Sequence, residues 1–145
     1  MSCTQTPTCG NAAVITPVLA AGSTTSPYYI SVHIAQRLCQ RSCAATPPVF
    51  RPAFSVVGWR EAASGQYLVT LLVQGVIAYT PCGQGPCCTQ SQLVSQAFTV
   101  PVASATAPTS ITVTAGEAAN RIDATPCRTC SRNFVSDVPL TLTVA

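Results

Sequence analysis

The chain has 145 residues, the length of one ordinary domain. Only 8% of its residues are charged, against about 25% in an average domain. The net charge of +3 comes from separated arginines, which argues against a nucleic-acid-binding patch. The 48% content of hydrophobic residues argues against disorder. A surface this poor in charge resists association weakly, which favours a protein that works within an assembly.

Residues 1–12 are predicted to form a flexible N-terminal arm, because they combine Ser, Thr, Gln, Pro and Cys without a periodic apolar pattern. Residues 13–145 are predicted to form a single all-β core, a β-sandwich or jelly roll of about seven or eight strands. Alternation of apolar and polar residues predicts strands at 13–19, 28–34, 54–59, 66–80, 92–103, 110–115 and 138–144.

Three features interrupt this strand pattern. Gly58 is expected to mark a β-bulge, and Gly75 is expected to kink or break the long strand at 66–80. Residues 33–44, with the sequence HIAQRLCQRSCA, are predicted to form one or two helical turns. In that helix Arg37 and Arg41 would lie on one side, because they are four positions apart.

The nine cysteines fall into four groups along the chain: Cys3 and Cys9; Cys39 and Cys43; Cys82, Cys87 and Cys88; Cys127 and Cys130. Because nine is odd, at least one thiol has no partner within the chain. We expect the arm cysteines, Cys3 and Cys9, to form disulfides with a neighbouring subunit, and the other seven to staple the core or to accept those bonds. The alternatives are that the arm cysteines pair within their own chain or stay reduced.

Zinc binding is the rival explanation for the cysteines. Cys82, Cys87, Cys127 and Cys130 would supply four thiolates, and the CxxC spacing of the last two is used by many structural zinc sites. The other half fits less well, since four residues including two glycines separate Cys82 from Cys87. We therefore expect the protein to bind neither a metal nor another cofactor.

No catalytic constellation emerges from the sequence. His33 is the sole histidine, and it alternates with apolar neighbours in a predicted strand, so we interpret it as a strand residue rather than a catalytic base. The four carboxylates share no motif, and phosphate-binding loops and a GxSxG nucleophile elbow are absent. Arg121, Arg128 and Arg132 are expected to pair with Asp123 or Asp137 at the surface. The sequence therefore predicts a protein that is not an enzyme.

Cysteine content and targeting pattern point in different directions. Dense cysteines indicate an oxidising environment, but the N-terminal sequence lacks the basic region and unbroken apolar stretch of a secretory signal. No run approaches 18 apolar residues, so no membrane span is expected. Intracellular metal binding, a missing signal, or oxidation after release from a lysing cell would each resolve the conflict. The last suits a component of a spore surface or a virion.

The segment from Met1-Ser2-Cys3 to Cys9-Gly10, the missing export signal, and a β-rich core ending at 138–144 together resemble the endospore appendage (Ena-type) pilins of spore-forming Firmicutes. Those pilins are small jelly-roll subunits without a signal peptide, and a Cys-bearing N-terminal connector crosslinks them within a fibre. The resemblance implies that Cys3 and Cys9 are connector cysteines. Their partners would be loop cysteines of neighbouring subunits.

These features predict a structural subunit that assembles with copies of itself into a helical, disulfide-crosslinked filament, located outside the cell or on a spore surface. One alternative is a monomeric, disulfide-stapled binding module, for which Phe50 and Trp59 are the candidate aromatic contacts, although Trp59 is expected to belong to the core. The others are a cysteine-ligated zinc domain and a phage capsid or tail protein. No nucleic-acid partner is expected.

Overall fold

The computed structural model describes residues 12–22, 24–43, 46–82, 89–123 and 130–145. The described residues form nine strands and no helix, which confirms the all-β prediction. The strands are β1 (Val14–Leu19), β2 (Tyr28–Cys43), β3 (Val49–Phe50), β4 (Ala53–Ala63), β5 (Gln66–Tyr79), β6 (Gln90–Ala103), β7 (Ile111–Ala115), β8 (Ala119–Ile122) and β9 (Cys130–Val144). Among these residues no helix exists that is long and apolar enough to cross a lipid bilayer. The predicted arm lies almost wholly outside the described residues.

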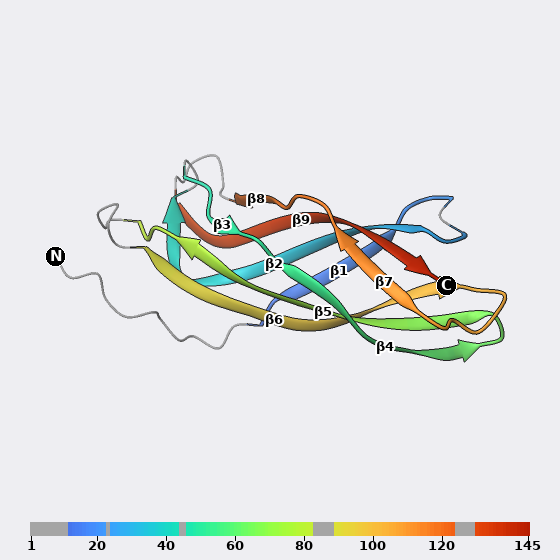
Figure 1. Ribbon diagram of the computed structural model, residues 1–145. Coiled ribbons are helices and arrows are strands. Elements are labelled where there is room, and N and C mark those ends of the chain that lie inside the picture. The colour runs from blue at the N-terminus through green and yellow to red at the C-terminus, as the bar shows by residue number, and fades with distance from the viewer. Residues whose placement is uncertain (1–11, 23, 44–45, 83–88, 124–129) are drawn as a thin grey trace.

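Two antiparallel sheets pack into an elongated sandwich (Figure 1). In the first, which we call sheet 1, β2 lies between β1 and β9, and both β7 and β8 pair with β9. In the second, sheet 2, β6 pairs along one side of β5, and β3 and β4 pair one after the other along its other side. The edge strands β1 and β6 contact each other across the two sheets, so one long side of the sandwich is formed by two strand edges.

Alternation along the central strands explains the core. Every second side chain of β5 is buried, including Tyr67, Val69, Leu71 and Val73, as the sequence pattern predicts. The inner faces of β2, β6 and β9 supply matching rows, and the two sheets bury these rows against each other. Between the sheets the rings of Phe50 and Phe134 meet edge to face, with their centroids 5.5 Å apart.

The two glycines behave differently from each other. The pairing register shifts between Val56 and Gly58, which confirms the predicted bulge. Gly75 neither kinks nor breaks β5, because pairing with β6 continues without a shift from Gln66 to Tyr79. Instead, a Cβ atom at Gly75 would lie only 2.7 Å from Cε1 of Phe50 and 3.1 Å from Cα of Pro52. Gly75 is therefore required for the close approach of β3 rather than for a turn.

The prediction of helical turns at 33–44 is wrong. β2 continues through this segment, and Ile34, Gln36 and Leu38 all point into the protein at strand spacing. The polar residue Gln36 concealed the strand alternation in the sequence. Its side chain can be buried because its Nε2 donates a hydrogen bond of 3.0 Å to the carbonyl of Arg37. Arg37 and Arg41 consequently lie along a strand and not on one side of a helix.

Candidate functional site

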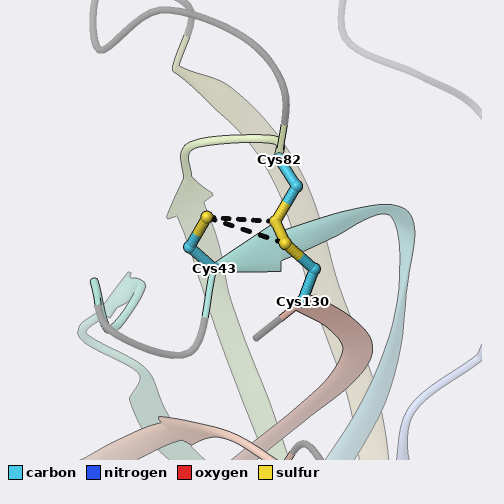
Figure 2. A group of neighbouring side chains, drawn as sticks. All are labelled: Cys43, Cys82 and Cys130. Atoms are coloured by element: carbon cyan, nitrogen blue, oxygen red, sulfur yellow. Dashed lines mark hydrogen bonds between the residues drawn. A yellow bond between two sulfur atoms is a disulfide. The ribbon is translucent and has the colours of Figure 1, made fainter. Parts of the chain in front are cut away.

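Three cysteine sulfurs meet at the end of the sandwich where β2 and β5 finish and β9 begins (Figures 1 and 2). Cys82 and Cys130 form a disulfide. The Sγ atom of Cys43 lies 3.0 Å from that of Cys82 and 3.8 Å from that of Cys130. Cys43 is a free thiol, and its side chain is half-buried. We call these three residues the cysteine cluster.

A register shift in sheet 1 brings Cys43 to the cluster. Arg37 pairs with Asn133, whereas Ser42 pairs with Ser131 and Cys43 with Cys130. Five steps along β2 therefore correspond to two along β9, so β2 carries three extra residues here. The shift places Cys43 directly opposite Cys130, at the spacing of a cross-strand pair.

Main-chain hydrogen bonds carry the end of β5 to the same place. The amide of Cys82 donates a bond of 2.8 Å to the carbonyl of Arg41. Beside it, Ser42 and Pro81 form an isolated antiparallel bridge. The chain leaving sheet 2 is thus tied to the last residues of β2 in sheet 1, and Cys82 faces the two cysteines of that sheet.

The Cys82–Cys130 disulfide links the two sheets at this end. It joins residues 48 apart in the sequence, and closing a loop of this length stabilises the fold by about 4 kcal/mol in the chain-entropy model. Such a bond forms in oxidising surroundings. Both residues belong to the group of cysteines predicted to staple the core or to accept bonds from the arm.

The three sulfurs of the cysteine cluster also define a candidate soft-metal site. These atoms all lie within 4.8 Å of one another. With the disulfide intact, only Cys43 offers a thiolate, and after reduction the cluster would offer three, one fewer than a closed structural zinc site uses. Of the four residues predicted to bind zinc, Cys82 and Cys130 come together, while Cys87 and Cys127 lie outside the described residues.

A basic hollow of about 600 Å³ opens beside the cysteine cluster. It is lined by Arg37, Arg41, Asp123, Cys130, Ser131, Arg132 and Asn133. Three arginines against one aspartate give the hollow that Cys130 lines a net positive charge. Cationic neighbours favour the thiolate form of a cysteine over the neutral thiol.

The remaining predicted cysteines are placed as follows. Cys39 lies on β2 and is disulfide-bonded, so its thiol does not contribute to the cluster. Its amide donates a hydrogen bond of 3.0 Å to Oε1 of Gln92, and Nε2 of Gln92 donates one of the same length to the carbonyl of Arg37. This buried glutamine thereby joins β6 to β2 near the cluster. Cys3, Cys9, Cys87 and Cys88 lie outside the described residues.

His33 forms a hydrogen bond with Asp137 on the outer face of sheet 1. Its Nδ1 atom lies 2.7 Å from Asp137, and Nη1 of Arg121 donates a bond of 3.0 Å to the other carboxylate oxygen. The hydrogen bond from His33, aided by the one from Arg121, holds the pKa of Asp137 below its usual value despite partial desolvation. The predicted pairing of Arg121 with Asp137 is confirmed, and the pair lies on the surface, where it contributes little to stability.

Two aromatic residues differ from their expected roles. Phe50, a candidate binding aromatic, is 1% exposed and belongs to the core. Trp59, expected in the core, is 37% exposed. Trp59 pairs with the core residue Val69, but it lies on the edge strand β4, where the facing sheet covers it incompletely.

Reasoning from the sequence missed Cys43 as the third member of the cluster. The CxxC spacing drew attention to Cys127, and no sequence signal reports the three-residue shift that aligns β2 with β9.

Comparison of the chain with protein-family models, curated protein sequences and solved structures gave no match.

Proposed function

We propose that this protein is a structural subunit that assembles with copies of itself into a filament, outside the cell or on a spore surface. Adjacent subunits pack through β-sheet surfaces, and disulfides formed by Cys3 and Cys9 of the N-terminal arm crosslink them. The observation that carries this proposal is the long, uncharged strand edge of β6.

Strand edges normally carry devices that prevent pairing with other chains, above all charged side chains. β6 spans 14 residues without a charged side chain, and within the described residues it pairs only with β5. Pro101, near the end of β6, lacks a backbone N–H donor and so disfavours pairing at that point. The residues of β6 that precede it have no such device. The adjacent edge strand β1 is likewise uncharged. An edge of this kind accepts a strand from another molecule.

Apolar side chains lie exposed around the same edge. Leu93 on β6 is 70% exposed, and its cross-strand neighbour Val76 on β5 points outward beside it. On β1, Val14 and Val18 are also exposed. Val14 and Val18 lie on the outer face of sheet 1, the face that also carries the polar group formed by His33, Arg121 and Asp137. Packing between copies would bury the apolar side chains, and that burial favours association.

The cysteines support a covalent component. An odd number of thiols leaves at least one without a partner inside the chain, and Cys43 is free in the part of the chain that the structure describes. A thiol donated by another subunit's arm would find an acceptor at this end of the sandwich. Intersubunit disulfides would make dissociation depend on reductant rather than on dilution.

The test is a denaturing gel of the oxidised, boiled protein with and without reductant. We expect a ladder, or material retained in the well, that collapses with reductant to one band at the subunit mass of 15.0 kDa. The Cys3→Ser/Cys9→Ser double variant should lose the ladder, and the matched Ser2→Ala/Thr8→Ser variant should keep it. A single monomer band in both lanes of the unmodified protein contradicts the proposal.

A second candidate function is zinc binding by the reduced protein, which the convergence of Cys43, Cys82 and Cys130 favours. Zinc would require reduction of the Cys82–Cys130 bond and a fourth ligand. Elemental analysis of protein purified under reducing conditions tests it: one tightly held zinc per chain supports a metal domain, and metal-free folded protein excludes it.

A further inference from the structure

A free thiol lies against a disulfide in the cysteine cluster, as Figure 2 shows. We propose that Cys43, Cys82 and Cys130 form an intramolecular thiol–disulfide exchange centre. In it, the thiolate of Cys43 displaces Cys130 from Cys82, so that the reactive sulfur passes from the end of β2 to the start of β9. This inference concerns chemistry within one chain and does not depend on filament assembly.

The step needs no external oxidant or reductant. The Cys43 thiol first gives its proton to water, and the resulting thiolate attacks the sulfur of Cys82. A bond forms between Cys43 and Cys82 while the Cys82–Cys130 bond breaks, and its electron pair leaves with Cys130 as a thiolate. One disulfide and one thiol are present before and after the step, so no net oxidation occurs.

Distances favour Cys82 as the sulfur attacked. The Sγ atom of Cys43 is closer to Cys82, at 3.0 Å, than to Cys130, at 3.8 Å. Both separations are short because the thiol lies beside the disulfide rather than on the extension of its axis. Displacement at sulfur proceeds along that axis, so the Cys43 side chain has to rotate about its Cα–Cβ bond before it attacks.

The backbone accommodates the product. Cys43 and Cys82 belong to segments already joined by the hydrogen bond from the Cys82 amide to Arg41 and by the bridge from Ser42 to Pro81. Cys43 and Cys130 are cross-strand partners, and partners of this kind lie within the Cα separation that a disulfide requires. The two segments that the new Cys43–Cys82 bond would join are therefore already held together by main-chain contacts.

Electrostatics favour Cys130 as the leaving group. Cys130 lines the hollow together with Arg37, Arg41 and Arg132. A leaving thiolate departs faster when its negative charge is stabilised, and guanidinium groups supply that stabilisation. The exchange thus moves the reactive thiolate to a residue that lines an open, positively charged hollow, where an external disulfide such as oxidised glutathione can capture it.

The test maps alkylation on the full-length, oxidised protein. The native protein is incubated with iodoacetamide at mildly alkaline pH, quenched with acid, digested without reduction, and analysed by mass spectrometry. We expect label on both Cys43 and Cys130, with the peptide linking Cys43 to Cys82 appearing in the same amount as labelled Cys130. Label on Cys43 alone, with the Cys82–Cys130 bond intact throughout, overturns the proposal.

Variants separate exchange from simple opening of the disulfide. Cys43→Ser removes the nucleophile, so Cys130 labelling should be lost; labelling that persists overturns the proposal. Arg132→Gln should lower the Cys130 share of the label, whereas Arg60→Gln, on β4, should leave it unchanged. Equal effects of the two arginine variants would contradict the role of the hollow.

A third variant tests the proposed product directly. In Cys130→Ser, oxidation by dissolved oxygen should join Cys43 to Cys82, and circular dichroism verifies that the variant is folded. The adjacent Ser131→Ala variant should retain the Cys82–Cys130 bond. If the folded Cys130→Ser protein keeps both Cys43 and Cys82 as thiols after complete oxidation of its other pairs, the cluster is not an exchange centre.

Discussion

Replacing Gly75 with alanine tests the packing of sheet 2 most sharply, because two effects of opposite sign compete. Alanine lowers the conformational entropy of the unfolded chain and normally favours a strand over glycine by about 0.5–1 kcal/mol. At Gly75, however, the new Cβ would lie 2.7 Å from a ring carbon of Phe50 and 3.1 Å from a backbone atom of Pro52. The ring can shift, but the backbone of Pro52 yields less easily.

We expect the steric effect to win. Phe50 is 1% exposed and is held edge to face against Phe134, so its ring has little room to move. Overpacking of this kind costs about 1–3 kcal/mol. For a chain of this size, that is a loss of about 2–4 °C in Tm per kcal/mol. Gly75→Ala should therefore melt several degrees below the unmodified protein in a thermal scan under oxidising conditions.

Gly58→Ala is the matched control. Gly58 also lies in sheet 2, but a Cβ there meets no atom within 4 Å, and its φ is not positive. This variant should be unchanged or slightly more stable. A double variant, Phe50→Leu with Gly75→Ala, should lose less stability than the sum of the two single changes, because the smaller side chain makes room for the methyl group. An increase in Tm for Gly75→Ala would refute the reasoning.

Two further predictions concern the surface. Leu93→Lys should change the free energy of unfolding of the monomer by less than about 0.5 kcal/mol, because the side chain is exposed. The same variant should weaken self-association in light scattering, because burying a leucine contributes about 1.5–3 kcal/mol at an interface. Unchanged association would exclude this face from the contact. Hydrogen bonds from His33 and Arg121 lower the pKa of Asp137 below its ordinary value of 3.8. The stability that ionised Asp137 contributes is therefore fully present above pH 3.8, and it is lost as the pH falls through the pKa of the folded state. Urea titrations of Asp137→Asn and the unmodified protein should therefore differ at neutral pH, by at most about 1 kcal/mol for this exposed group, and converge in acid; a constant difference would contradict this assignment.

The sequence predicted the central strands well because their buried faces consist of uninterrupted apolar residues. Along β5, the alternation from Tyr67 to Val73 survives into the structure without exception. The C-terminal strand shows the same pattern from Val138 to Leu142. Period-two alternation reports burial directly when one face of a sheet packs on a core.

Prediction failed where polar residues occupy buried positions. In β2, Gln36 and Ser42 point inward, so the apolar pattern between Ile34 and Cys43 resembles neither a strand nor a loop. The segment 33–44 was therefore predicted to form helical turns, with Arg37 and Arg41 on one side. Tertiary pairing with β9 decides the outcome, and a single sequence does not contain that information. The short strand β8 was missed for a related reason, since among its four residues only Ile122 is buried.

The cysteine cluster was predictable only in part. The expectation that loop cysteines staple the core anticipated a bond such as Cys82–Cys130. The recruitment of Cys43 depends on the shift that follows Arg37, where β2 gains residues relative to β9. A bulge of this kind is set by packing between distant segments. The free thiol of Cys43 and the arginine-lined hollow beside the cluster therefore depend on the fold rather than on any local sequence motif.

Electron microscopy of the oxidised full-length protein tests the central proposal most directly. Subunits that join through the uncharged edge of β6 and are crosslinked by cysteines should form filaments of uniform width, and these should survive boiling in detergent and disassemble when a thiol reductant is added. Dispersed single particles, at concentrations where the protein is folded and its disulfides are intact, would contradict the assignment of this chain as a self-assembling structural subunit.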